Sequence, residues 1–325
     1  MKKLLALILS TFLLLSCLTA CSSKAITVCY TIYPVEYLLN RIAEKYVNTC
    51  NLSQAKVPIQ VAHIADDYSD SLDKANLILQ LGNLEPYWEI YESEIKSSKA
   101  EIIDLSGLAG IYDFKRYTTG KVSGNSVTVE GNWYEGSAFS SIDMYSKDLG
   151  LWLDPIAMSS MARTIKDWLV ENDPNNSGVY EANFIELEAD LVRLDSEYSA
   201  ISSQNLSLVT ITPSFGNWQK DYNVGIYPLI LSRYGALPND DQLKIIEDRI
   251  KNDKVKYIVY ESNMTEDMIN LYNKVKADCG LTEVDLSNLS SLTEKEYNQN
   301  KDYLTIMYDN LNKLDLKKEN IIVQD

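Results

Sequence analysis

The sequence of 325 residues contains a single histidine, His63, and this scarcity excludes a wide range of chemistry. A Ser-His-Asp or Cys-His catalytic set, a zinc site with several imidazoles and an H-E-x-x-H motif all depend on histidine. No other pairing of a nucleophile with a base can be identified along the chain. We therefore expect a binding protein and not an enzyme.

Basic residues are also few: the sequence has 30 Lys and Arg and 46 Asp and Glu, which gives a net charge of −16. A surface this acidic repels phosphate backbones and anionic lipid headgroups. We expect no nucleic-acid partner and regard cations as the natural counter-charge, although the same acidity also serves solubility. The hydrophobic content of 46% is that of a globular protein, and the length suits about two domains.

The N-terminus has the pattern of an export signal. Two lysines precede an apolar run over residues 4–15, which is too short to span a membrane and suits the core of a secretory signal. Leu-Thr-Ala then precedes Cys21, and this resembles the bacterial lipobox, with Cys17 as a less favoured site. We predict a lipoprotein signal peptide over residues 1–20 and a chain anchored through acylated Cys21 on the extracytoplasmic face of a bacterial cell membrane.

Export would leave three cysteines outside the anchor, Cys29, Cys50 and Cys279. Three cysteines allow at most one disulfide, and Cys29–Cys50 is one possibility that the sequence leaves open. No C-x-x-C motif occurs, so we do not expect a thiolate metal site.

The first part of the mature chain alternates apolar strand-like runs with helical spacing, which is typical of a parallel α/β lobe. We assign this N-terminal lobe to residues 21–172. Strands are predicted at Ile26–Ile32, Ile59–Ala62 and Leu77–Leu81, and helices around residues 38–46, at Glu85–Ile95 and from Pro155 onward. Within the lobe, residues 107–150 lose periodicity and read as a long irregular surface loop with room for a hairpin around Val127–Val129.

The clearest periodic pattern follows. Apolar side chains recur at alternating spacings of four and three, namely Tyr180, Phe184, Leu187, Leu191, Leu194, Tyr198 and Ile201. This pattern predicts a helix from Pro174 to about Ser203, within an inter-lobe segment of residues 173–204; a coiled coil is the alternative. Residues 205–325 form the predicted C-terminal α/β lobe, with strands at Leu208–Thr212, Tyr257–Tyr260 and Leu281–Leu286 and helices at Pro238–Lys251, Met264–Ala277 and Tyr303–Leu314.

This order of lipobox, lobe, long helix and lobe resembles the TroA-like solute-binding lipoproteins of zinc and manganese ABC importers. The most specific match is LWLDPIAMSSMARTIKDWLVENDPNNSGVYEANFIELEADLVRLDSEY, with further matches in TIYPVEYLLNRIAE, ANLILQLGNLEPYWE, VKYIVYES and DYLTIMYDNLNKL. The resemblance implies two α/β lobes joined by one long helix and a divalent cation as the transported ligand. It also implies an ABC permease and its ATPase as partners of a monomeric binding protein.

The family's metal ligands are largely replaced in this sequence. Asp66 stands at the position of the first histidine, with His63 three residues earlier, and Gly150 stands at the second, directly before L-W-L-D-P. Thr212, near Ser214, stands at the third position. A glycine cannot coordinate, and a threonine supplies only a neutral hydroxyl.

The donors that remain are rich in oxygen. Asp285 is retained at the family's fourth position, and Asp66 with His63, Asp67 or Glu261 could complete a set. Such a set suits Mn²⁺, Mg²⁺ or Ca²⁺ better than zinc. We therefore predict zinc binding much weaker than several imidazoles would give.

Aromatic residues leave two alternatives open. Trp133, Tyr134, Trp152 and Trp218 lie near the expected mouth of the cleft, where they could stack on an organic ligand or a metal chelate. The alternative to an importer component is a surface lipoprotein, adhesin-like or an assembly factor, that keeps the fold and binds a non-metal ligand or none.

Overall fold

The computed structural model describes residues 25–54, 57–108, 114, 116–122, 125–131, 134 and 136–314. The predicted lipidation site at Cys21 and the cleft residue Trp133 lie outside these ranges. Among the residues described, no helix combines the length and the hydrophobicity that crossing a membrane would require.

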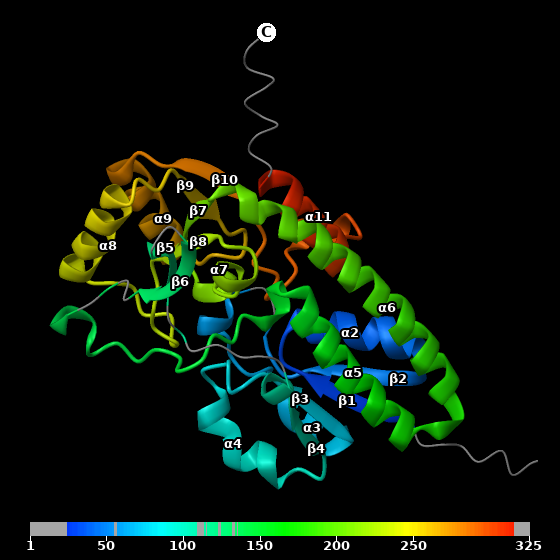
Figure 1. Cartoon of the computed structure of the whole chain (residues 1–325). Helices are drawn as coiled ribbons and strands as arrows, with labels where there is room; N and C mark the ends of the chain where they lie inside the picture. Colours follow the sequence, from blue (N-terminus) through cyan, green and yellow to red (C-terminus); the bar gives the residue numbers. More distant parts are fainter. Residues whose placement is uncertain are drawn as a thin grey trace, which may run out of the picture.

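The N-terminal lobe is built on a four-stranded sheet in the order β2-β1-β3-β4, with every pair parallel. Its strands are β1 (Ile26–Tyr30), β2 (Val47–Asn51), β3 (Leu77–Gln80) and β4 (Glu101–Asp104), and its helices are α2 (Tyr33–Ala43), α3 (Tyr68–Lys74) and α4 (Trp88–Ser97). Figure 1 shows this lobe at the lower right, in blue and cyan. The predicted strands in β1 and β3 are confirmed, whereas β2 was not predicted, because its outward-facing polar residues give no apolar run.

The predicted strand at Ile59–Ala62 is wrong. Residues Ile59–Val61 form a short 3-10 helix, in which the Val61 amide donates to the Pro58 carbonyl and the Ala62 amide to the Ile59 carbonyl. These local bonds use the N–H groups that a sheet ladder would need. A short apolar run by itself does not distinguish the two conformations.

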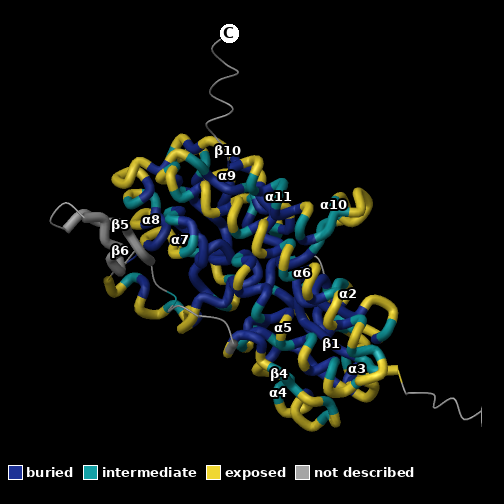
Figure 2. The backbone as a smooth tube through the Cα atoms, turned by 45° about the vertical axis from the view of Figure 1, so that its right-hand side comes forward, coloured by how far each residue is buried: buried dark blue, intermediate teal, exposed yellow. Residues whose placement is uncertain are grey.

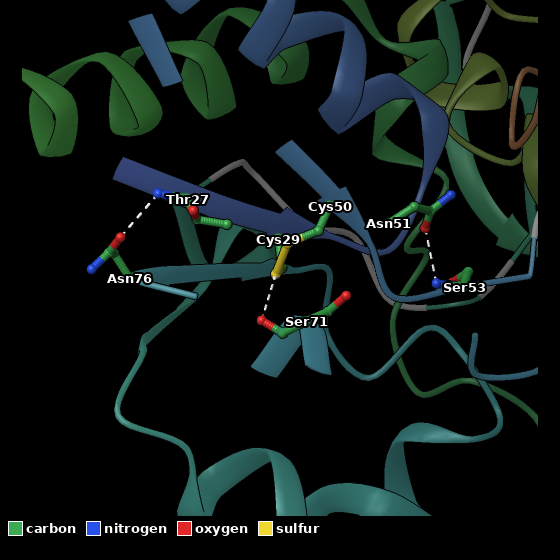
Figure 3. The surroundings of a disulfide bond; sticks show 7 residues. All are labelled: Thr27, Cys29, Cys50, Asn51, Ser53, Ser71 and Asn76. Atoms are coloured by element: carbon green, nitrogen blue, oxygen red, sulfur yellow. Dashed lines mark hydrogen bonds between the residues drawn. A yellow bond between two sulfur atoms is a disulfide. The ribbon is translucent and has the colours of Figure 1, made fainter. Parts of the chain in front are cut away.

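The structure settles the cysteine pairing that the sequence left open. Cys29 of β1 and Cys50 of β2 are direct neighbours in the parallel register and form a disulfide (Figure 3). The bond joins β2 to β1, which is fully buried at Cys29. Cys279 is a free thiol.

The C-terminal lobe repeats this plan with the strand order β10-β9-β7-β8, again parallel throughout. Its strands are β7 (Ser207–Thr210), β8 (Gly225–Pro228), β9 (Tyr257–Tyr260) and β10 (Thr282–Asp285), and its helices are α7 (Trp218–Asp221), α8 (Asp240–Asn252), α9 (Glu266–Cys279), α10 (Glu294–Asn298) and α11 (Tyr303–Leu314). The three predicted strands and three predicted helices of this lobe are confirmed, and β8 is the strand that the sequence did not reveal.

Two long helices lie between the lobes along the chain and pack against each other, and the second one reaches from the N-terminal lobe to the C-terminal lobe (Figure 1). Asp154 caps α5 (Pro155–Asn172) by accepting a hydrogen bond from the Ile156 amide. The second helix is α6 (Ser177–Tyr198), flanked by 3-10 turns at Pro174–Asn176 and Ser199–Gln204. It packs against α2 and α5 of the N-terminal side and against α11 of the C-terminal lobe.

The periodic side chains of α6 are the ones that it buries. The buried set is Tyr180, Phe184, Leu187, Leu191, Leu194 and Tyr198. Figure 2 shows buried and exposed stretches alternating along α6, and most of the residues between the buried ones are exposed. The long helix is therefore a strut between two α/β lobes, as predicted.

The irregular segment after β4 contains a hairpin, as the sequence allowed, formed by β5 (Arg116–Val122) and β6 (Asn125–Gly131). The residues that follow lie on the C-terminal lobe, although they precede α5 in the chain. The Gln242 side chain donates to the Ala138 carbonyl at 2.7 Å, and the Tyr134 hydroxyl donates to the Pro228 carbonyl at 3.1 Å. The segment thus covers the lobe that comes later in the sequence.

Candidate functional site

The lobes meet closely around Trp152, which lies in a 3-10 turn (Leu151–Leu153) before α5. Its indole N–H donates to the Asn288 carbonyl at 2.7 Å, and its own carbonyl accepts from the Tyr303 hydroxyl at 2.7 Å. Trp152 is buried, so it acts as a fixed contact with the C-terminal lobe and offers no free ring face. Trp218 is likewise buried and donates to the Leu153 carbonyl.

Glu261 follows β9 and occupies the centre of a buried hydrogen-bond network. One carboxyl oxygen accepts from the amides of Ile211 and Thr212 at 2.8 and 2.9 Å. The other accepts from the Thr212 hydroxyl and from the Asn288 side chain, both at 2.7 Å. Burial raises the pKa of Glu261, and these four bonds oppose that shift.

This network decides what Glu261 can do. A carboxylate has about four acceptor positions, and all of them are used within the protein. Glu261 therefore holds the loop after β7 against the segment after β10, and coordination of a metal would require breaking these bonds. The network does bring together the predicted Thr212 and Ser214, whose hydroxyl oxygens lie 2.8 Å apart.

Gly150 has no room for any side chain. A Cβ atom at this position would lie 2.3 Å from the carbonyl oxygen of Ser214. The backbone packing at position 150 therefore excludes a metal-ligating side chain, just as the glycine itself does. Asp148, which the sequence analysis missed, lies beside it and accepts from the Gly150 amide at 3.2 Å. The Asp148 carboxylate also occupies the space where Gly216 would carry a Cβ.

A small cavity of about 10 Å³ lies between these groups and is lined in part by Gln60, Asp148, Trp152 and Ser214. This volume is that of a single water molecule. Trp152 and Ser214 were predicted to line a ligand cleft; they do share a cavity, but one too small for an organic solute or a metal chelate. Gln60 was missed, because it lies in the apolar run that read as a strand.

The other predicted metal ligands lie apart from this cavity. His63, Asp66 and Asp67 are exposed just before α3, and the Gln54 side chain donates to Asp66 at 3.0 Å. Asp285 ends β10, also exposed, with the Lys313 ammonium 3.3 Å away. Within the described part of the chain, no three His, Cys, Asp or Glu side chains come together to hold a metal ion. The predicted ligand set thus stays a prediction.

A much larger cavity, of about 560 Å³, is lined by both lobes. The N-terminal lobe contributes residues between 31 and 62, and the C-terminal lobe contributes the segment 290–298 around α10. None of the predicted site residues lines it. No local sequence pattern indicates this cavity, because its walls come from segments more than 200 residues apart.

The match to a protein family spans both lobes: residues 28–316 match the model of ZnuA, described as the periplasmic component A of a zinc-uptake complex. The zinc-binding protein AdcA of Streptococcus pyogenes serotype M6 is 29% identical over 171 residues, which cover 52% of this chain and 33% of that protein. The zinc-binding lipoprotein AdcA of Streptococcus pneumoniae serotype 4 is 23% identical over 325 residues, covering 97% of this chain and 60% of that one. The chain thus spans only part of the length of these curated relatives.

Solved structures show the same fold. The Zn(II)-bound ZnuA-like domain of Streptococcus pneumoniae AdcA superposes with a TM-score of 0.64 at 20% identity, covering 89% of this chain and 97% of that chain. The periplasmic zinc-binding protein TroA of Treponema pallidum superposes with a TM-score of 0.68 at 16% identity, covering 89% and 98%. With the family match along both lobes, the chain belongs to the ZnuA family of periplasmic zinc-uptake components.

Proposed function

We propose that this chain is the extracytoplasmic solute-binding lipoprotein of an ABC importer of the divalent-metal uptake type. The observation that supports this most directly is the family match over residues 28–316, which includes both lobes and the helices between them. Such a protein captures its solute between the lobes and presents it to the permease and ATPase. The task needs different affinities in the open and closed states, and no catalytic group.

The cargo that the family implies is a divalent cation, and the residues of this chain favour weak zinc binding. Gly150 is closed to any side chain by the Ser214 carbonyl, and the Glu261 carboxylate is fully hydrogen-bonded. The donors left, Asp66 and Asp285 with His63, are mostly oxygens, which suit Mn²⁺ or Ca²⁺. They are exposed and do not come together in the described structure, so a cation would have to draw them together. Zinc affinity is therefore far below that of a site with several imidazoles.

Calorimetry with Zn²⁺, Mn²⁺ and Ca²⁺ tests this cargo on the wild type, His63→Ala and Asp285→Ala. Asp278→Ala is a matched control, because Asp278 is also an exposed aspartate paired with a lysine. We expect weak zinc binding that the first two variants reduce and the control leaves unchanged. Tight zinc binding that survives the loss of both His63 and Asp285 would place the site elsewhere.

The importer role itself is tested in a bacterium that expresses the chain. Deletion should lower the accumulation of zinc or manganese from dilute medium, and the wild-type chain should restore it. Cys21→Ala should release soluble protein or leave an uncleaved precursor, detected by detergent partitioning and mass spectrometry of the N-terminus. Unchanged metal accumulation after deletion would argue against the importer role. Nothing among the described residues favours the alternative of a non-transport lipoprotein.

A further inference from the structure

The cavity of about 560 Å³ is a second candidate binding site, and its lining does not include Glu261, although Asn288 links its wall to the Glu261 network. Its C-terminal wall includes Ser290 and Ser291, whose hydroxyls accept from the Asn263 side chain at 3.0 and 3.3 Å. The Asn288 side chain in turn accepts from the Ser290 amide and hydroxyl, at 3.1 and 2.9 Å. This wall is therefore held in place by buried hydrogen bonds before any ligand arrives.

The charged residues in the described part of the lining are all acidic. Glu36 and Glu294 line the cavity, and none of the described lining residues is Lys, Arg or His. Glu36 is only partly exposed, and burial raises the pKa of its carboxyl while a hydrogen bond from Tyr30 lowers it. No Lys or Arg among the described residues forms an ion pair with Glu36. A cation bound in the cavity would give this carboxylate a positively charged partner beside the Tyr30 hydroxyl.

The remaining walls suit an organic molecule. Tyr33 and Tyr297 line the cavity, and Tyr297 is 72% exposed although it is a large aromatic residue. Ile32, Val57 and Leu292 add apolar surface. Pockets for small organic ligands commonly have volumes of about 300–1,000 Å³, and tyrosine faces attract ammonium groups through cation–π contacts. A bare metal ion would leave most of this volume unfilled.

We propose that this cavity binds an organic ammonium compound, with Glu36 as the counter-charge and Tyr33 and Tyr297 as the aromatic contacts. The inference goes beyond the metal-uptake role, because it needs no metal ligand. Because both lobes form the walls, such a ligand contacts both at once and favours the closed arrangement of the lobes.

Choline and its uncharged isostere 3,3-dimethylbutan-1-ol form the test pair, with calorimetry and thermal unfolding on the full mature chain. Spermidine serves as a larger ammonium probe and glutarate as an anionic one. We expect at least one of the two ammonium probes to bind and to raise the melting temperature, and we expect the isostere and glutarate to do neither. Glu36→Gln and Tyr297→Ala should each weaken the binding about tenfold or more. Because Tyr297 is highly exposed, Tyr297→Ala tests the site even where Glu36→Gln disturbs folding.

Glu186→Gln is the matched control, because it removes the same charge from the exposed face of α6. Binding that falls as much in Glu186→Gln as in Glu36→Gln reports general attraction to an acidic protein and overturns the proposal. Equal affinity for choline and its isostere, tighter binding of glutarate, or no binding of either ammonium probe overturns it as well. None of these results bears on the importer role, because that role is tested separately by the accumulation of metal in cells.

Discussion

Glu85 should make the stability of this protein depend on pH near neutrality. It lies between β3 and α4, its side chain is 1% exposed, and no described residue donates a hydrogen bond of normal geometry to either carboxyl oxygen. Burial raises the pKa of Glu85 from 4.5 to about 7, against a smaller opposing effect of the Thr31 hydroxyl. The folded protein therefore keeps a proton on Glu85 at pH values where the unfolded chain has lost it.

The sign and size of the effect follow from this difference. Between pH 4.5 and about 7 the folded state binds more protons than the unfolded state, so the free energy of unfolding falls as the pH rises. Above about pH 7 the full cost is present, and it amounts to about 3 kcal/mol at 1.36 kcal/mol per pH unit. Glu85→Gln keeps the shape of the side chain and removes the charge, so it should remove most of this cost.

Urea unfolding of the wild type and Glu85→Gln at pH 5 and pH 8 measures the effect. We expect the variant to be more stable by up to about 3 kcal/mol at pH 8 and by well under half of that at pH 5. Glu186→Gln, on the exposed face of α6, should change little at either pH. If Glu85→Gln gains no more stability at pH 8 than at pH 5, the reasoning is refuted. That result would mean that ionised Glu85 does not destabilise the folded protein.

Three further predictions test the packing. Leu191→Ala should lower the free energy of unfolding in urea by about 2–5 kcal/mol, because Leu191 is fully buried in α6. Val192→Ala is the control on the same helix: Val192 is 52% exposed, so this variant should be nearly neutral. Equal costs for the two variants would contradict the role of α6 as a strut. Replacing Cys29 and Cys50 by serine should lower stability by about 3 kcal/mol, since the disulfide closes a loop with a sequence separation of 21, and the wild type under reducing conditions should match the double variant. Gly150→Ala should lower the free energy of unfolding by about 1–3 kcal/mol, because its Cβ atom would clash with the Ser214 carbonyl oxygen. For the same reason Gly150→His should not create tight zinc binding. A stable Gly150→His variant that binds zinc tightly would show that the clash does not occur.

Local patterns in the sequence determined most of the elements of this fold. The spacing of the apolar residues from Tyr180 to Tyr198 places them on one side of a helix, and that side is buried whatever it meets. Apolar runs such as Leu77–Leu81 likewise predict buried parallel strands, and the single histidine rules out a site with several imidazoles. These conclusions depend only on composition and on residues close together in the chain, so they can be predicted from the sequence.

Tertiary structure decided the rest, because it depends on which distant segments meet. The disulfide between Cys29 and Cys50 requires the register of β1 on β2, and β2 itself is a polar edge strand without an apolar run. From the sequence, Glu261 could be a metal ligand, but the structure shows that its carboxylate is already fully hydrogen-bonded, in part by Thr212. From the sequence, Gly150 only lacks a side chain, but the structure shows that the Ser214 carbonyl leaves no room for one. The large cavity exists because two lobes fold separately and leave a space between their surfaces, and no local pattern records the shape of that space.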